Sequence, residues 1–398
     1  MSVTAPAGFV AAGTSCGTKG PGELDLALVA SDDSRSVPAA AVFSTNLAAA
    51  APVVVSRAHL KSSGGHAAAV VVSSGNANAA TGLRGLADAE RICELAGGEL
   101  GVAASEVLVC QTGLIGVPMT MVPIETGMAA LVSARAGGTE AARRAAEAMM
   151  TTDTFRKEAV VEGRGFRVGG MAKGAAMLAP HMELAGGFAH ATMLALLTTD
   201  ACCEPSDLAA ALVGAVDPTF NRMTLDGCTS TNDTVVVLAS GRSQASPGPG
   251  ELAAALEAVC GQLAGMMAAD AEGATKVAKV SVGGAASEAE AHRAARKIAE
   301  STLVKCSLNG EDPYWGRVVS ELGSAGVAFE IDNVEVAYGG TVVCRGGVAA
   351  EHDTEALRAY MKQRSLEIAC DLGMGTSTAT VLTCDLGHGY IDENRTTS

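Results

Sequence analysis

The sequence ATMLALLTTDA, from Ala191 to Ala201, decides how the fold of this chain is interpreted. Its apolar and β-branched residues predict a strand from Thr192 to Thr198, followed by the polar Asp200. A threonine inside a strand carries no functional information, because β-branched residues are favoured there. A threonine that begins a chain is different, since its free α-amine, with a pKa of about 7.7–8.0, can accept the proton of its own hydroxyl. Cleavage between Ala191 and Thr192 would therefore make Thr192 nucleophile and base together.

Outward from this run, short apolar stretches alternate with Ala-rich amphipathic ones. Further strands are predicted over Ala67–Val72, Glu106–Cys110, Phe166–Met171, Thr234–Ala239 and Val277–Val282. Helices are predicted over Thr139–Met149, Ser206–Ala215, Glu251–Ala268, Glu288–Ser301 and Thr354–Arg364. After about residue 280, Asp and Asn turns and a predicted hairpin over Ala328–Val336, with Gly339–Gly340 beside it, indicate a separate smaller α+β region. The pattern predicts an α/β or α+β fold with mixed sheets.

Length and composition describe a protein with a large core of small side chains. The 398 residues predict two to three domains, and 48% of them are hydrophobic while only 3% are aromatic. The formal net charge is −15 and no dense stripe of Lys and Arg opposes it, which argues against nucleic-acid binding. Mean hydropathy is +0.27, yet no uninterrupted apolar run reaches the roughly 18 residues of a membrane span. The N-terminus has no signal-like pattern, so we expect a soluble, cytoplasmic protein that does not bind membranes.

The spacing of cysteine and histidine predicts no metal site. The 11 cysteines include no C-x-x-C pair, and the 7 histidines include no H-x-x-x-H pair. The odd number of cysteines predicts reduced, mostly buried thiols rather than a disulfide framework.

Three turn segments and two charged residues are candidates for chemistry. Gly13–Gly17 has the G-x-S-x-G spacing of a hydrolase nucleophile elbow, but no helix pattern follows, so a surface turn is favoured. Ser74–Asn78 and Gln111–Gly116 each follow a strand-like run and can present backbone N–H groups to an oxyanion, or simply connect strand to helix. Lys173 can pair with a substrate carboxylate or reach solvent. Glu272 can pair with a substrate ammonium or belong to a solvated helix end.

Nine segments in order along the chain resemble the ornithine acetyltransferase (glutamate N-acetyltransferase) family of arginine biosynthesis. They are SGNANAATG (74–82), QTGLIGVPM (111–119), MTTDTFRKE (150–158), GGMAKGAAMLAP (169–180), ATMLALLTTDA (191–201), DGCTSTNDT (226–234), DAEGATK (270–276), LVKCSLNGEDPYWGR (303–317) and YIDEN (390–394). The resemblance covers essentially the whole chain. It implies a layered αββα sandwich of the α/β (α+β) class with a smaller C-terminal α+β domain. Residues 1–191 would form the α chain, 192–279 the start of the β chain that completes the sandwich, and 280–398 the C-terminal domain.

The resemblance also implies roles for individual residues. Family members cleave themselves before a threonine, which matches the bond between Ala191 and Thr192 and makes Thr192 the nucleophile of an acetyl-enzyme. Thr112 and Gly113 match the residues that stabilise the oxyanion. The matched substrate contacts are Thr151, Lys173, Thr192, Glu272, Asn394 and Ser398.

The implied reaction is a ping-pong transfer of an acetyl group from N²-acetylornithine to glutamate, without a cofactor or metal. Acetyl-CoA as an additional donor stays open. The resemblance further implies an assembly of two α and two β chains.

One departure from the family pattern leaves other functions open. Eight extra residues, Glu183–His190, directly precede the expected cleavage site. They can loop out, displace Lys173 relative to Thr192, or impair self-cleavage. An uncleaved, inactive binding protein is therefore one alternative. Independently of this departure, an N-terminal-nucleophile hydrolase or aminopeptidase of similar fold is a second alternative, which would use Thr192 but pass the acyl group to water.

Two smaller departures lie in the C-terminal third. Tyr314 stands where the family usually has Asn in D-P-N-W-G-R. The tail after Asn394 is one residue shorter than usual, so the terminal substrate contact falls on Thr397 or Ser398.

Overall fold

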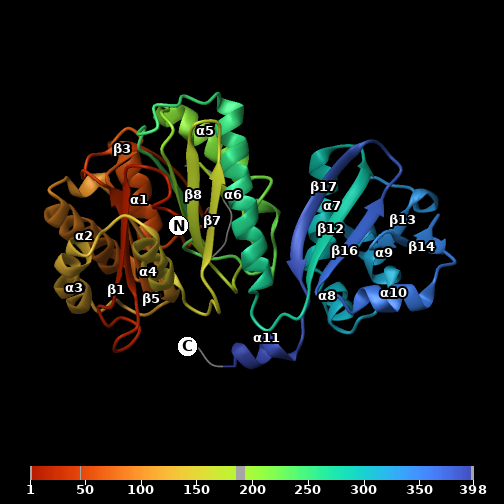
Figure 1. Cartoon of the computed structure of the whole chain (residues 1–398). Helices are drawn as coiled ribbons and strands as arrows, with labels where there is room; N and C mark the ends of the chain where they lie inside the picture. The colour runs from red at the N-terminus through yellow and green to blue at the C-terminus, as the bar shows by residue number, and fades with distance from the viewer. Residues whose placement is uncertain (1, 45, 185–192, 396–398) are drawn as a thin grey trace. The chain divides into compact units, whose positions relative to one another are not determined.

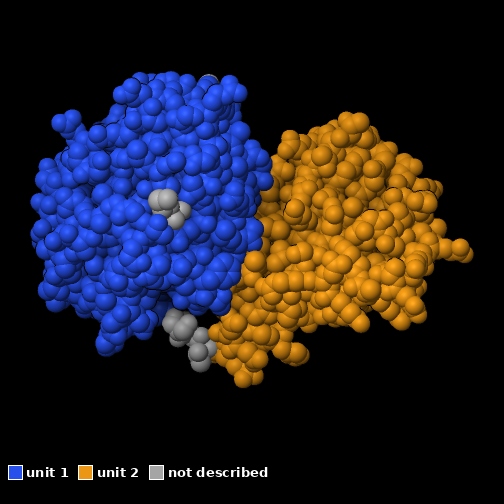
Figure 2. All heavy atoms as spheres, in the orientation of Figure 1, with its two compact units in different colours: residues 1–221, 228–267, 398 blue, residues 222–227, 268–397 orange. Residues whose placement is uncertain are grey.

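The computed structural model describes residues 2–44, 46–184 and 193–395, which form two compact units (Figures 1 and 2). Unit 1 contains the described residues up to 221 together with 228–267, and unit 2 contains 222–227 and the described residues from 268 onward. The expected cleavage residues Ala191 and Thr192, and the tail residues Thr397 and Ser398, lie outside the described residues.

The first sheet of unit 1 has the strand order β1-β2-β5-β6. Its strands are β1 (Phe9–Thr14), β2 (Leu26–Ser31), β5 (Ala69–Asn76) and β6 (Val107–Leu114). Strands β1, β2 and β5 pair antiparallel, whereas β5 and β6 are parallel. Because parallel strands end at the same edge, the polar segments that follow β5 and β6 come together.

The second sheet of unit 1 has the order β4-β3-β11-β10-β8-β7, and β9 pairs onto β3. Its strands are β3 (Val37–Ser44), β4 (His66–Ala67), β7 (Lys157–Glu162), β8 (Arg167–Lys173), β9 (Met182–Glu183), β10 (Leu194–Thr199) and β11 (Thr234–Ala239). Strand β10 is buried along its whole length, parallel to β11 and antiparallel to β8. The strand predicted near Thr192–Thr198 is thus a central strand, and its described part begins at Leu194.

Helices pack against the faces of both sheets, and the buried residues of one of them, over 141–149, belong to the core between the sheets. They are α1 (Ala51–Ser62), α2 (Gly82–Leu100), α3 (Val122–Ser133), α4 (Thr139–Met149), α5 (Pro205–Val216) and α6 (Pro249–Ala269), with 3-10 turns at Ala104–Glu106 and Phe220–Arg222. On β2, Ala27 and Val29 face the core between the sheets, whereas Leu26 and Leu28 face α2 and α3. Figure 1 shows α5 and α6 on the side of the second sheet. The predicted αββα sandwich is confirmed.

Helix α6 is long and apolar enough to span a membrane, judged by length and composition alone. Its apolar stripe is nevertheless used inside unit 1. Leu256, Val259 and Leu263 are fully buried, and a Cβ added to Gly170 of β8 would come within 2.7 Å of Val259 Cγ1. Because glycine at position 170 permits this close approach, α6 packs tightly against the sheet as a core helix.

Unit 2 is built on a six-stranded sheet of order β15-β14-β13-β16-β12-β17. Its strands are β12 (Val277–Ala285), β13 (Glu335–Tyr338), β14 (Thr341–Arg345), β15 (Val348–Ala349), β16 (Ser365–Asp371) and β17 (Ser377–Cys384). Its helices are α7 (Glu288–Glu300), α8 (Thr302–Asn309), α9 (Trp315–Ser324), α10 (Thr354–Met361) and α11 (His388–Glu393), with a 3-10 turn at Ile331–Asn333. One continuous apolar core joins the sheet to α7, α8, α9 and α10.

The hairpin predicted over Ala328–Val336 is wrong in position. Residues Ile331–Asn333 form a 3-10 turn, and the hairpin consists of β13 and β14. Gly339 and Gly340 make its two-residue turn, with φ of 55° and 81°. Such a turn needs two left-handed residues, so the glycine pair belongs inside the hairpin and not beside it.

Candidate active site

The parallel pairing of β5 and β6 places the two predicted turns side by side. Ser74 is in register with Thr112, and Gly75 with Gly113. Gly113 has φ of 131°, and a Cβ there would lie 2.3 Å from the Gly75 carbonyl carbon and 2.6 Å from Asn76 N. Only glycine allows the two backbones to approach this closely. The predicted oxyanion residues therefore lie near the end of β6, where the close approach of the β5 backbone restricts position 113 to glycine.

Lys173, the last residue of β8, reaches Thr112 from the other sheet. Its Nζ donates a hydrogen bond of 3.2 Å to Thr112 Oγ1. Both residues are buried, at 4% and 1% exposure. Because the ammonium group is a donor only, the Thr112 hydroxyl keeps its own hydrogen for a further acceptor. The contact thus orients Thr112 as a hydrogen-bond donor.

Asp153 links Thr151 to this pair. Its Oδ1 accepts hydrogen bonds from Lys157 Nζ at 2.6 Å and Gly174 N at 2.7 Å, and its Oδ2 accepts one from Thr151 N at 3.1 Å. Lys173 Nζ lies 4.0 Å from Oδ2. Burial acts to raise the pKa of Asp153, but the Lys173 and Lys157 ammonium groups lower it by more, so the carboxylate stays ionised. The structure therefore brings Thr112, Thr151 and Lys173 together.

Asn232 holds both turn segments from the side of β11. Its Nδ2 donates to Ala77 O at 2.6 Å and to Gln111 O at 2.9 Å, and the residue is 1% exposed. Because Gln111 directly precedes Thr112, this side chain fixes the strand end that carries the predicted oxyanion residues. Asn232 and Asp153 were not among the predicted site residues, although they lie within the family-like segments DGCTSTNDT (226–234) and MTTDTFRKE (150–158).

The chain enters β10 next to Lys173. Leu194 is in register with Lys173 across the antiparallel pair, and the Met193 N–H donates to Asp233 Oδ1. Thr192, the predicted nucleophile, is joined to Met193 by one peptide bond. Ala191 and Thr192 are outside the described residues, and so are positions 185–190 of the extra segment, whose first residue, Glu183, belongs to β9.

The remaining predicted substrate contacts belong to unit 2. Asn394 Nδ2 donates to Glu272 Oε2 at 2.8 Å. Gly273 packs against the start of α11, where an added Cβ would lie 2.1 Å from the Gly389 carbonyl carbon, and its N–H donates to Glu393 Oε1 at 3.1 Å. The DAEG segment and the C-terminal helix therefore form one surface. Ser398, the last predicted contact, is outside the described residues.

The G-x-S-x-G segment is a turn wrapped around a carboxylate. Asp25 accepts hydrogen bonds from four successive backbone N–H groups, those of Cys16, Gly17, Thr18 and Lys19, at 2.6–3.2 Å. Ser15 is exposed, and the next element is strand β2. The N–H groups of this turn are used to bind the Asp25 carboxylate of the same chain, so the segment has a structural role. This agrees with the surface turn that the sequence favoured over a nucleophile elbow.

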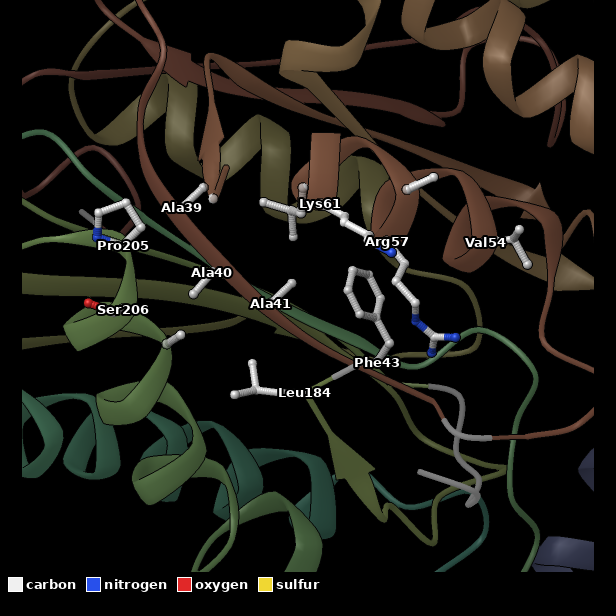
Figure 3. A pocket seen from close by; sticks show the side chains of 14 residues that line it. Ala39, Ala40, Ala41, Phe43, Val54, Arg57, Lys61, Leu184, Pro205 and Ser206 are labelled. Atoms are coloured by element: carbon white, nitrogen blue, oxygen red, sulfur yellow. The ribbon is translucent and has the colours of Figure 1, made fainter. Parts of the chain in front are cut away.

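A pocket of about 630 Å³ elsewhere in unit 1 contains none of the predicted site residues (Figure 3). It is lined by β3 residues such as Ala40 and Phe43, by α1, and by Leu184. Its Arg57 donates to Ser44 O at 3.1 Å and lies 5.4 Å from the centre of the Phe43 ring. This arginine therefore supports the local packing of the pocket wall. The candidate active site is the group of residues around Thr112 and Lys173, and this pocket is not part of it. No group of three His, Cys, Asp or Glu side chains suited to a metal occurs in the described ranges.

Comparison with known proteins supplies the family. The ArgJ family model matches residues 10–396. The arginine biosynthesis bifunctional protein ArgJ of Thermobifida fusca is 44% identical over 396 residues, covering 99% of both chains, and that of Streptomyces avermitilis is 46% identical over the same share. The solved ArgJ of Bacillus halodurans matches 50% of this chain and 96% of its own at 35% identity with a TM-score of 0.48. The ornithine acetyltransferase of Mycobacterium tuberculosis, solved with ornithine, matches 46% and 96% at 41% identity with a TM-score of 0.44. The resemblance found in the sequence is confirmed, and this chain belongs to the ArgJ family.

Proposed function

We propose that this chain is a self-processing acyltransferase that moves the acetyl group of N²-acetylornithine to glutamate. Its relatives in Thermobifida and Streptomyces are bifunctional proteins of arginine biosynthesis. The observation that carries the proposal is the buried hydrogen bond from Lys173 Nζ to Thr112 Oγ1, because it presents a hydroxyl donor beside the strand that follows Thr192.

The proposed reaction begins after cleavage between Ala191 and Thr192. Thr192 Oγ attacks the acetyl carbonyl carbon while the freed α-amine takes the hydroxyl proton. The Thr112 hydroxyl and the Gly113 N–H donate to the oxyanion that forms. The bond to nitrogen then breaks, and ornithine leaves with the proton held by the amine. The amine of glutamate attacks the acetyl ester, which releases N-acetylglutamate and restores Thr192.

Two charged residues that match the family's substrate contacts are assigned to substrate selection in this proposal. Lys173 suits a substrate carboxylate, and Glu272 suits a substrate ammonium. Thr151, Asn394 and the tail residue Ser398 complete the proposed contacts. Acetyl-CoA can load the same ester, so glutamate acetylation from that donor is part of the proposal. We place the enzyme in the cytoplasm as an assembly of two α and two β chains.

The first test is the denatured intact mass of purified wild type beside Thr192→Ala. We expect fragments of residues 1–191 and 192–398 in the wild type only. A single full-length chain in both proteins would mean that the extra segment blocks maturation and would favour an uncleaved binding protein.

The second test separates transfer from hydrolysis. Cleaved enzyme is incubated with N²-acetylornithine with and without glutamate, and N-acetylglutamate, ornithine and acetate are quantified. We expect N-acetylglutamate in amounts equal to ornithine when glutamate is present. Release of acetate at the same rate without glutamate would identify a hydrolase.

A further inference from the structure

Lys19 is a half-buried cation to which the proposed reaction assigns no role. It ends the turn that wraps the Asp25 carboxylate, and its own N–H donates to Asp25 Oδ2 at 3.2 Å. Four successive N–H groups hold this turn on one carboxylate, and hydrogen bonds to an ionised acceptor are strong. The turn therefore sets where the Lys19 side chain leaves the backbone.

The Lys19 ammonium lies at the C-terminal end of α4. Its Nζ donates to Ala148 O at 3.4 Å and to Met150 O, and a third hydrogen bond goes to Leu24 O at 3.0 Å. Carbonyls at the end of a helix have no partner within the helix and lie at the negative end of its dipole, so a cation is stabilising there. Lys19 therefore caps α4 at the point where the chain continues to Thr151.

The same helix end is bound to the end of β5. Ser74 Oγ donates to Ala148 O at 2.5 Å, and Thr18 Oγ1 donates to Ser74 O at 3.0 Å. A Cβ added to Gly75 would lie 3.2 Å from Lys19 Cγ. The turn that ends at Lys19 is therefore packed against β5, which pairs with the strand that carries the predicted oxyanion residues.

The peptide unit that joins Met150 to Thr151 is held from two sides. Its carbonyl oxygen accepts a hydrogen bond from Lys19 Nζ, and its N–H donates to Asp153 Oδ2 at 3.1 Å. Because a peptide unit is planar, binding both of its polar atoms fixes the orientation of the plane. Thr151 is exposed, so its side chain extends into open space from a backbone whose direction is set.

We propose that Lys19 is a positioning residue of the acetyltransferase site, which orients the Met150–Thr151 peptide unit and thereby the Thr151 side chain for the substrate. The inference rests on the proposed function, because Thr151 is a substrate contact only in that reaction. Lys19 does not bind the substrate itself, since an ammonium group has three N–H donors and three carbonyl oxygens accept from this one.

Lys19 also lies within the charged group of the site. Burial lowers the pKa of Lys19 and the Lys173 ammonium lowers it further, whereas the carboxylates of Asp25 and Asp153 act in the opposite direction. Two routes from Lys19 to the substrate follow from this placement. One runs through the orientation of Thr151 and the other through the charge near Lys173, and the test separates them.

The test is a double-mutant cycle on the mature enzyme, measured as KM and kcat for N²-acetylornithine at saturating glutamate. Lys19→Met keeps the apolar stem and removes the ammonium, and Thr151→Ala removes the side chain that Lys19 orients. Each single variant should raise KM about tenfold, the size of one lost hydrogen-bonded contact, with kcat changed less than about twofold. The double variant should also lie about tenfold above the wild type, because Lys19 then has no side chain to orient.

An additive result would overturn the inference. A KM about 100-fold above the wild type in the double variant would show that Lys19 acts independently of Thr151, through its charge. An unchanged KM in Lys19→Met would overturn the inference as well and would leave the proposed function intact. A wild type without transfer activity would instead refute the proposed function, on which the inference rests.

Arg144→Met is the matched control. The Arg144 side chain extends from α4, and its Nε donates to Gly13 O at 3.1 Å, at the start of the same turn. Because this hydrogen bond is made at the start of the turn and not at the end of α4, the substitution should leave KM and kcat unchanged. A KM raised as much as in Lys19→Met would assign the effect to a general loosening of the turn and overturn the inference.

Lys19→Gln keeps the test decisive if Lys19→Met fails to fold. Its neutral amide retains two N–H donors on a shorter side chain, so it leaves fewer polar atoms unsatisfied than methionine does. Its KM should again rise, and it should not rise further when Thr151→Ala is added. Additive increases in KM would again overturn the inference.

Discussion

Lys173 and Thr112 lie on strands of different sheets, and the hydrogen bond of 3.2 Å from Lys173 Nζ to Thr112 Oγ1 joins the two sheets at the candidate site. The bond occupies a lone pair of the hydroxyl and leaves its hydrogen to point elsewhere. An ordinary surface threonine rotates freely, whereas this one is held by a buried cation. A donor fixed before the reaction costs no reorganisation when negative charge develops.

Thr112→Val should therefore lower kcat for acetyl transfer by about 100–1,000-fold, the usual effect of losing one oxyanion donor. Valine has nearly the same shape, so the sandwich should still fold. Steady-state assays with N²-acetylornithine and glutamate measure the effect. Thr112→Ser, which keeps the hydroxyl, is the control and should retain most activity. Full activity in Thr112→Val would remove this residue from the oxyanion site.

Gly113→Ala should disrupt the end of the β5–β6 pair, because the new Cβ would overlap the Gly75 carbonyl carbon at 2.3 Å. We expect loss of transfer activity and a lower melting temperature. Gly116→Ala is the matched control: Gly116 also has positive φ, 80°, but no atom lies within 4 Å of an added Cβ. That variant should cost only about 1–2 kcal/mol of stability through backbone strain. Equal losses in the two variants would contradict the steric argument.

Asp153→Asn should destabilise the protein at neutral pH by about 3–5 kcal/mol, because it removes the buried carboxylate that Lys157 Nζ contacts at 2.6 Å. The pKa of Asp153 is lower in the folded state, so its contribution is complete above its unfolded pKa of about 3.9 and is lost as pH falls through the folded value. The stability difference between wild type and variant should be constant from pH 7 down to about 4 and then shrink. Thermal unfolding across this range measures it, and a difference that instead grows with acid would reverse the assigned sign.

Glu272→Gln should raise the KM for N²-acetylornithine about tenfold with little change in kcat, because it removes a charge suited to the substrate ammonium. Glutamine keeps an acceptor for Asn394 Nδ2, so the contact within unit 2 survives. Glu393→Gln, on the same surface and bonded to Gly273 N, is the control for a general loss of negative charge. A similar KM in both variants would show that Glu272 has no specific role.

The strands and helices that the sequence named overlap observed ones, because short apolar runs and amphipathic stripes are local signals. The sequence did not name β1, β2, β3 and β7, or the helices α1, α2 and α3. The hairpin near residue 335 was misplaced because the Gly339–Gly340 pair was read as lying beside it. Asp153 and Asn232 were missed for a different reason. Asn232 acts on Gln111, which is 121 residues earlier, and Asp153 acts on Lys173 across a strand pair. No periodicity in a sequence encodes such long-range partners.

The strand order of the second sheet bears on how the mature protein would unfold. Strand β10 lies between β8 and β11, and β11 pairs with β3, so a cut before Thr192 leaves segments from both products alternating in one sheet. The precursor refolds as one molecule, whereas the cleaved protein must bring two chains together to rebuild the same hydrogen bonds. The refolding yield of the cleaved protein should therefore rise with protein concentration. Once its two chains have separated, the cleaved protein regains its fold less readily than the precursor, so its persistence would depend on how slowly it unfolds.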